Sequence, residues 1–406
     1  MAKKLRSDRP VFRIALVAFS IVAAMGLIYL VEELLGVLGI VQAVGLVLPP
    51  RQRVKYETPE FVYVAETNSL GFRDREFSVS RTSSRRIVVL GDSIPYGWGV
   101  AAEESWPKRL EANLHGGKSS VEVANLGLPG AGPADYAQIA ARAIPSLRPD
   151  LVIVAITQGD DLASMADYDS RKCAPPPELS WRSRLRHLFP NLTQLIRPRE
   201  APGYTPLVTS EWKQQVQTIL ERASASERKR FEGLEPRLRE AFLRGELNPP
   251  VLAGSWRSPA YFMKTMLPGP ERQSLIDSMA SCLAKIRSLG ELANAQVVVV
   301  AAPFAAYVAR RNFEIRRTLG FEVDESMLVS NEMDEAIRLA ATAAGLPFIA
   351  VTEQFRTARP DPPLFFELDG HPTARSHRLL ADSITAAVRA ALERGHALVP
   401  LHQGGK

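Results

Sequence analysis

A serine directly after a buried-strand pattern is the first residue of this sequence whose setting suggests chemistry. Ser93 ends the apolar segment "IVVLGDS" at 87–93. A serine hydroxyl is a weak nucleophile at neutral pH, so a positioned imidazole must take its proton before it attacks a carbonyl carbon. Of the six histidines, only His371 has both a nearby acid, Asp369, and a place in a loop before the last expected helix. Serine, histidine and acid are together the residue types of acyl-transfer chemistry.

Short apolar segments alternate with helical segments around these residues. Such alternation predicts an α/β fold in which a parallel sheet carries helices on both faces. Ligands bind these sheets beyond the carboxyl ends of the strands, and Ser93, Gly130 and Asp160 all lie at such ends. We expect strands within 87–93, 120–130, 149–161, 295–303 and 347–351, and helices within 105–115, 133–147, 271–293, 330–345 and 374–395.

The other segments divide the chain around this α/β domain. A stretch of loop-like and charged amphipathic sequence interrupts the alternation, which predicts an inserted helical subdomain. In chain order we expect a membrane anchor at 1–50, a stalk or linker that becomes an edge element at 51–84, the first half of the domain at 85–164, the insertion at 165–270, the second half at 271–397 and a polar tail at 398–406.

The first fifty residues have the pattern of a membrane anchor. Five basic residues and one acid precede the uncharged apolar run 14–31. About 20 apolar residues cross a bilayer core, and the basic flank favours a cytoplasmic N-terminus. The pattern therefore predicts a single-pass inner-membrane protein with its catalytic domain outside the cytoplasm. A cleaved signal peptide is the alternative, but apolar sequence resumes at 34–50. If that second run also spanned the membrane, the body would face the cytosol.

Composition and motifs argue against a nucleic-acid-binding protein and against a cofactor-dependent one. The chain has 406 residues and a net charge of +6, with part of the excess at the N-terminus and in the segments 182–187 and 197–200. No zinc-ligand spacing or stacking-aromatic motif accompanies this charge, so a solvated or membrane-facing surface is favoured over nucleic-acid binding. The sequence contains neither a phosphate-binding loop nor a cluster of metal-ligand residues, so no cofactor is predicted.

Two cysteines, Cys173 and Cys282, allow one disulfide in an oxidising compartment. The oligomeric state is not predicted.

Four sequence blocks follow one another along the chain: "LGDSIPYGWGV" at 90–100, "NLGLPG" at 125–130, "QGDD" at 158–161 and "DGHPTARSH" at 369–377. These blocks resemble the SGNH/GDSL hydrolase family, whose members are esterases and acyl-transfer enzymes. The resemblance covers about 60–400 except the insertion, and it implies a flavodoxin-like three-layer α/β/α fold. A further segment, "NSLGFRD" at 68–74, resembles one that precedes the first block in membrane-associated bacterial members.

The resemblance implies a role for each residue of a catalytic triad. Ser93 is expected to be the nucleophile, His371 the general base and Asp369 the acid that orients the imidazole. The usual family spacing is Asp-x-x-His, whereas this chain has Asp-x-His, which resembles the branch involved in polysaccharide O-acetylation. Glu367 is the alternative orienting acid. His377 is expected to pack or to cap a helix.

The implied oxyanion hole departs from the family pattern at one position. The backbone N–H groups of Ser93 and Gly130 match the first two donors, with Gly127 as the alternative to Gly130. The third donor is normally an asparagine amide, but Asp160 stands in its place. An ionised carboxylate would repel the oxyanion. Either the site works with two backbone donors, or Asp160 stays protonated, or another group donates.

These expectations lead to one principal function and two alternatives. The principal one is a serine esterase that forms an acyl-enzyme on an O-acyl, for example O-acetyl, glycan or lipid-like substrate outside the membrane. An O-acyltransferase to a polysaccharide would use the same first half-reaction. A binding or assembly module with a decayed site is the alternative from another class, for which Asp160 is the argument.

Overall fold

The computed structural model describes residues 8–38, 48, 51–77, 85–115, 120–167, 173, 189, 192 and 209–394. The expected polar tail, the two internal basic segments and most of the first part of the insertion lie outside these residues.

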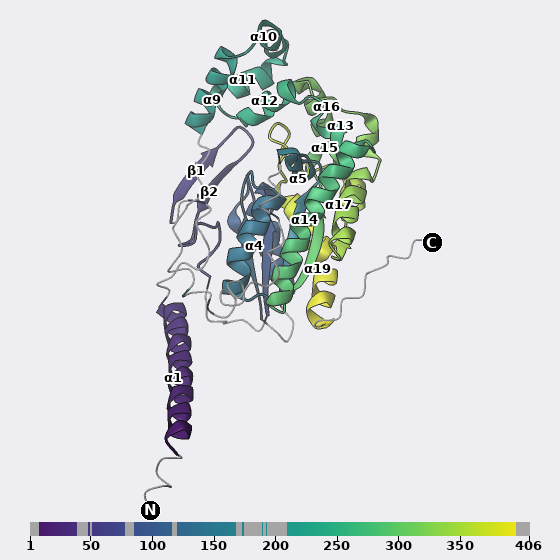
Figure 1. Ribbon diagram of the computed structural model, residues 1–406. Helices are drawn as coiled ribbons and strands as arrows, with labels where there is room; N and C mark the ends of the chain where they lie inside the picture. The colour runs from purple at the N-terminus through teal and green to yellow at the C-terminus, as the bar shows by residue number, and fades with distance from the viewer. Residues whose placement is uncertain are drawn as a thin grey trace, which may run out of the picture.

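A five-stranded parallel sheet forms the centre of the molecule (Figure 1). The strands lie in the order β4-β3-β5-β6-β7. Counted in chain order within this sheet, that is 2-1-3-4-5, the flavodoxin-like order, so the predicted α/β fold is confirmed. The strands are β3 (Arg85–Gly91), β4 (Val121–Gly127), β5 (Leu151–Thr157), β6 (Gln296–Ala302) and β7 (Phe348–Ile349).

Helices cover both faces of the sheet because successive strand side chains point to opposite faces. Val88 and Leu90 share a core with one set of helices, and Ile87 and Val89 share a core with the other. The first set is α4 (Pro133–Leu147), α14 (Pro270–Leu292) and α17 (Glu332–Ala343), and the second is α3 (Trp106–Leu114) and α19 (Ala374–Arg394). The result is the expected three-layer arrangement.

Short helices follow the strands at the carboxyl edge of the sheet and between the longer helices. They are α2 (Ser93–Tyr96), η1 (Ala102–Glu104), α5 (Asp160–Ser164), η2 (Met165–Asp167), α15 (Ala305–Val308), α16 (Arg310–Leu319), η3 (Glu325–Leu328) and α18 (Thr352–Thr357).

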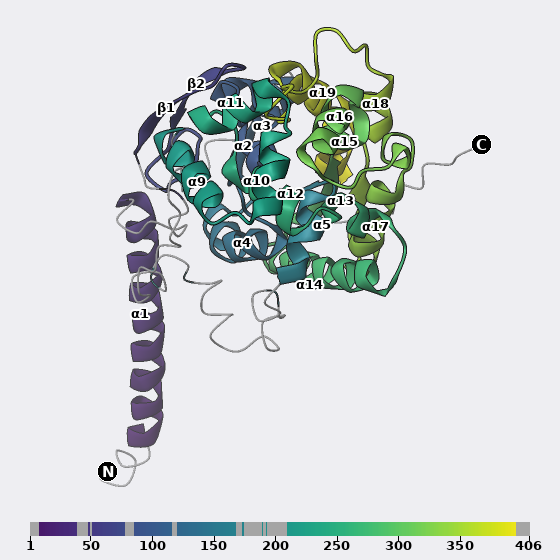
Figure 2. The same ribbon diagram turned by 90° about the horizontal axis from the view of Figure 1, so that it is seen from above.

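The described part of the insertion is helical, and its helices lie over the carboxyl end of the sheet (Figure 2). Their apolar side chains form a separate core with Phe313 and Leu319 of α16. The helices are α9 (Thr209–Glu221), α10 (Ala225–Glu232), α11 (Pro236–Arg244), α12 (Pro249–Arg257) and α13 (Tyr261–Met266).

The hairpin before the domain corrects one expectation. Strands β1 (Arg53–Glu57) and β2 (Val62–Glu66) pair with each other in a separate antiparallel sheet and do not extend the edge of the main sheet. One face of the hairpin carries Tyr56 and Tyr63, whose rings stack on each other and pack against Trp98. This aromatic contact with the loop after Ser93 explains why the hairpin lies over that loop.

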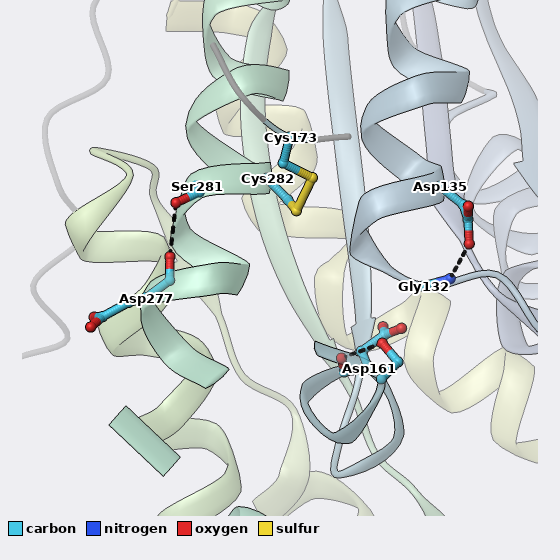
Figure 3. The surroundings of a disulfide bond; sticks show 8 residues. Gly132, Asp135, Asp161, Cys173, Asp277, Ser281 and Cys282 are labelled. Carbon is cyan, nitrogen blue, oxygen red and sulfur yellow. Dashed lines mark hydrogen bonds between the residues drawn. A yellow bond between two sulfur atoms is a disulfide. The ribbon is translucent and has the colours of Figure 1, made fainter. Parts of the chain in front are cut away.

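The N-terminal helix and a disulfide complete the architecture. Helix α1 (Asp8–Leu38) contains a 24-residue apolar stretch, Phe12–Leu35, long enough to cross a membrane. Figure 1 shows α1 beyond one end of the α/β domain and the insertion helices beyond the other. Cys173, near the start of the insertion, forms a disulfide with Cys282 of α14 (Figure 3).

Candidate active site

Ser93 stands at the sharp turn between β3 and α2. The strand ends at Gly91, and the helix begins at Ser93 itself. The Asp92 carboxylate caps the helix, because its Oδ1 accepts a hydrogen bond from the Ile94 N–H at 2.9 Å. Asn125 braces the same turn by donating to the Pro95 carbonyl oxygen at 2.6 Å. Asp92 and Asn125 therefore stabilise backbone around the serine.

The structure brings Ser93, His371 and Asp369 together across 278 residues of chain. His371 Nε2 lies 2.8 Å from Ser93 Oγ, and His371 Nδ1 lies 2.5 Å from Asp369 Oδ1. Because the carboxylate can only accept, the Nδ1–H donates to it and leaves the Nε2 lone pair facing the serine hydroxyl. The same Asp369 oxygen also accepts the His371 backbone N–H at 3.0 Å, so the short Asp-x-His spacing still orients the ring.

The acid and the base stabilise each other's charged forms. Burial by itself lowers the pKa of His371, but the charge and hydrogen bond of Asp369 outweigh it and the net pKa lies above its usual value. Burial raises the pKa of Asp369, yet the contact with His371 leaves that pKa below its usual value. A base held beside such a carboxylate is suited to take and return a proton during acyl transfer.

The loop that carries Asp369 is held by a residue that the sequence analysis did not single out. The Glu60 carboxylate, between β1 and β2, accepts the backbone N–H groups of Leu368 at 2.9 Å and Asp369 at 2.8 Å. Glu367 does not orient the imidazole, because its carboxylate pairs with Arg237 and Arg311 at 2.8 Å each. The alternative that made Glu367 the orienting acid is therefore wrong.

Arg73 holds the loop that follows Ser93. Its buried guanidinium donates to the carbonyl oxygens of Tyr96, Gly97 and Val100 at 3.2, 2.6 and 2.7 Å. It also lies over the ring of Tyr63, 4.7 Å from the centroid. Arg73 belongs to the 68–74 segment, so the sequence pattern marked the segment but gave no reason to choose this residue.

Two backbone N–H groups stand where an oxyanion could be bound. Ser93 and Gly130 both line the cavity, and within the described part of the chain neither amide N–H has a backbone acceptor. Gly130 has a φ of 76°, in the left-handed region that glycine favours. Gly127 is required for packing, because a Cβ there would lie 2.3 Å from the Tyr96 nitrogen. The Gly127 N–H donates to Asn125 Oδ1 at 3.0 Å and Gly127 does not line the cavity, which favours Gly130 over Gly127.

Asp160 accepts a hydrogen bond and does not take the place of an amide donor. The Tyr261 hydroxyl, from α13 of the insertion, donates to Asp160 Oδ1 at 2.6 Å, and Asp160 is exposed. Its two buried neighbours have raised pKa values. Burial, followed by the charge of Asp160, raises the pKa of Asp92 to about 6. Burial and then the charges of Asp92 and Asp160 raise the pKa of Asp161 well above its usual value. This arrangement favours a site with two backbone donors.

A cavity of about 450 Å³ opens beside the triad. Its volume falls in the range of small-molecule sites. The insertion forms its roof, and Trp98, whose ring lies 5.8 Å from that of His371, forms part of the wall. The roof residues are Asn248, Pro250, Val251, Gly254, Tyr261 and Phe262. In the described residues, no group of three or more His, Cys, Asp or Glu side chains is arranged to hold a metal ion.

Comparison with known proteins gives similarities at low identity only. No family model matches the chain, and no curated protein matches it. Among solved structures it is similar to TesA, with 11% identity, a TM-score of 0.37 and coverage of 76% of this chain and 99% of that one. It is also similar to the esterase EstA from Pseudoalteromonas sp., with 11% identity, a TM-score of 0.37 and coverage of 76% of this chain and 100% of that one. For the acetylxylan esterase Axe2 from Geobacillus stearothermophilus, the identity is 11%, the TM-score is 0.37, and the match covers 76% of this chain and 95% of that one.

At these scores the similarities carry no weight for function. The order of the sheet and the contacts of Ser93 are properties of this chain itself. The chain is an α/β protein with a five-stranded parallel sheet and, at low identity, a structural similarity to esterases.

Proposed function

We propose that this chain is a serine esterase of the SGNH/GDSL type that forms an acyl-enzyme on Ser93. The observation that carries the proposal is the continuous hydrogen-bond path from Ser93 Oγ through His371 to Asp369, at the wall of a cavity. Three side chains from two distant parts of the chain meet in the geometry that acyl transfer requires. The intact triad also argues against a decayed binding module.

The geometry supports a two-step reaction. Ser93 Oγ attacks the ester carbonyl carbon while His371 Nε2 takes the hydroxyl proton. The tetrahedral oxyanion faces the N–H groups of Ser93 and Gly130. As the carbon–oxygen bond to the alcohol breaks, Nε2 returns the proton to the leaving oxygen. Water then attacks the acyl-enzyme with His371 again as base, and the free acid leaves.

The substrate that we propose is an O-acyl, for example O-acetyl, glycan or lipid-like molecule outside the membrane. Helix α1 is long and apolar enough to anchor the chain. The disulfide between Cys173 and Cys282 fits an oxidising compartment, which supports a catalytic domain outside the cytoplasm. The insertion helices, which contribute residues to the wall of the cavity, lie at the end of the domain away from α1 (Figure 1), where an envelope polymer could reach the site.

Turnover of a chromogenic acetyl ester tests the proposal. We expect 4-nitrophenyl acetate to be cleaved by the wild-type chain. Ser93→Ala should reduce kcat on the order of 10⁴-fold or more. Ser383→Ala, which removes a hydroxyl of α19 that does not line the cavity, is the matched control and should keep wild-type activity. Equal turnover in Ser93→Ala and the wild type would contradict the proposal.

An added acceptor separates hydrolysis from transfer. With an oligosaccharide present, free acetate identifies an esterase, whereas acetylated sugar identifies an O-acyltransferase that uses the same acyl-enzyme. The first outcome is expected.

A further inference from the structure

Arg316 is a buried cation in the wall of the active-site cavity. It lies in the last turn of α16, is 6% exposed and lines the cavity together with Ser93 and His371. Its guanidinium carbon lies 5.6 Å from the centroid of the Phe304 ring, which also lines the cavity. A charged group in these largely apolar surroundings costs free energy unless an opposite charge or hydrogen-bond acceptors compensate it.

The compensation that the chain offers to Arg316 is weak. Its one hydrogen bond within the described residues runs from Nη2 to the Asp369 carbonyl oxygen, at 3.5 Å. No carboxylate of the described residues lies within 4.0 Å of its guanidinium. The two acids whose charges act on it are Asp369 and Asp160, but Asp369 is bonded to His371 and Asp160 to Tyr261.

Two other buried arginines have carboxylate partners on the protein. Arg86, which is 1% exposed, pairs with Glu122 at 2.9 Å and donates to the Leu147 carbonyl oxygen at 2.7 Å. Arg272 pairs with Glu332 at 2.8 Å. These two have structural partners on the protein, whereas Arg316, which lines the cavity, has a single long hydrogen bond within the described residues.

We propose that Arg316 forms a subsite for a carboxylate group carried by the ester substrate. This inference rests on the proposed esterase function and names the class of ester. The planar guanidinium fork can bind a carboxylate through two parallel hydrogen bonds. A carboxylate is also favoured over a phosphate monoester, because its single charge is balanced by one guanidinium. A second negative charge would lie close to Asp160 and Asp369.

The subsite lies within reach of the reacting ester. Arg316 Nη2 is next to the backbone of the loop that leads into His371, since a Cβ on Gly370 would lie 2.9 Å from it. The substrate carboxylate can belong to the acyl part or to the alcohol part, and each position has its own matched pair of test esters.

Paired esters of similar size, one with a carboxylate and one with a neutral group in its place, test this subsite. For the alcohol part, the pair is 4-acetoxybenzoate and 4-acetoxybenzamide. For the acyl part, it is 4-nitrophenyl hydrogen adipate and its methyl ester. In at least one pair we expect the wild type to prefer the carboxylate in kcat/KM by about 10- to 100-fold, as for a hydrogen-bonded charge pair. Arg316→Gln should bring that ratio to about one.

Arg317→Gln is the matched control. Arg317 is the next residue of α16, half exposed and paired with Glu314 and Glu325, so its removal should leave the ratio at the wild-type value. Arg316→Lys keeps the charge without the fork and should give an intermediate ratio. If the wild type shows no preference in either pair, or if Arg316→Gln keeps the preference, the subsite is disproved.

Binding without turnover separates this proposal from the esterase itself. In Ser93→Ala, calorimetry should show 4-acetoxybenzoate or the adipate monoester binding at least about tenfold more tightly than its neutral partner. The additional change Arg316→Gln should remove that difference. If no ester is cleaved but this difference is present, the esterase function fails and the carboxylate subsite stands. If the difference is absent, the subsite fails whatever the activity.

Discussion

Two histidines six residues apart have opposite surroundings. His371, in the loop before α19, has a carboxylate on Nδ1 and a serine hydroxyl on Nε2. His377, in the first turn of α19, is 1% exposed, and its Nδ1 accepts the Trp106 N–H at the start of α3 at 3.2 Å. Burial, then the charges of Arg73 and His371, lower the pKa of His377 to about 3, whereas the pKa of His371 is raised. Burial lowers the pKa of both imidazoles, and only His371 has a carboxylate neighbour that outweighs this effect.

Replacing each histidine in turn should give the largest contrast. His371→Asn removes the base and should reduce kcat on 4-nitrophenyl acetate on the order of 10⁴- to 10⁶-fold. His377→Asn leaves every contact of Ser93 in place and should change kcat less than about tenfold. Steady-state kinetics, with circular dichroism to verify folding, measures both. Comparable losses in the two variants would remove the functional distinction between them.

Removing the carboxylate partner should make His371 behave more like His377. Asp369→Asn should reduce kcat on the order of 10⁴-fold. Without the charge of Asp369, burial lowers the pKa of the His371 imidazole. The imidazole then stays deprotonated down to a lower pH. The acid limb of the residual kcat/KM profile should therefore move to lower pH, as a pH–rate series would show. An acid limb that stays in place would mean that Asp369 does not set the pKa of the base.

Acid stability should report on His377. Its pKa in the folded state, about 3, is below that of a free imidazole, so the unfolded state holds more protons as the pH falls below about 6.5. This histidine should reduce the free energy of unfolding by about 1.4 kcal/mol for each pH unit below that point. Urea denaturation at pH 7.5 and pH 5 should show a smaller acid loss in His377→Gln than in the wild type. An identical loss in both would refute the buried neutral imidazole.

Asp160→Asn should have the smallest effect. The wild-type carboxylate raises the pKa of Asp92, which in turn raises that of His371. The amide should therefore flatten the pH dependence near pH 6 and keep or moderately raise activity at neutral pH. Initial rates from pH 5 to 8 measure this. A collapse of activity at neutral pH would show that the carboxylate itself takes part in the reaction.

The parts of the molecule that local patterns specify could be predicted from the sequence. The β-branched runs gave the strands of the sheet, and helical spacing gave α4, α14 and α19, because each pattern reflects a single buried face. The triad residues could be proposed from their motifs, since the strand ends and the last loop fix their neighbours along the chain.

Long-range contacts of ordinary residues could not be predicted. Glu60 and Leu368 are 308 residues apart, and no periodicity relates a glutamate between two strands to the distant loop that carries Asp369. The position of the hairpin depends on aromatic packing against Trp98, and an alternating strand pattern cannot tell a separate sheet from an edge strand. The burial of Arg316 could not be predicted either. A charged residue on a short helix is expected to be exposed, and only the packing of distant segments shows that it is buried.

Covalent labelling of Ser93 by a fluorophosphonate probe, read by peptide mass spectrometry, tests the central claim most directly. The account predicts one adduct on the Ser93 peptide in the wild type and in His377→Asn, and none in His371→Asn over the same time. An adduct on Ser93 that forms as fast in His371→Asn, or an adduct on another serine in place of Ser93, would contradict it.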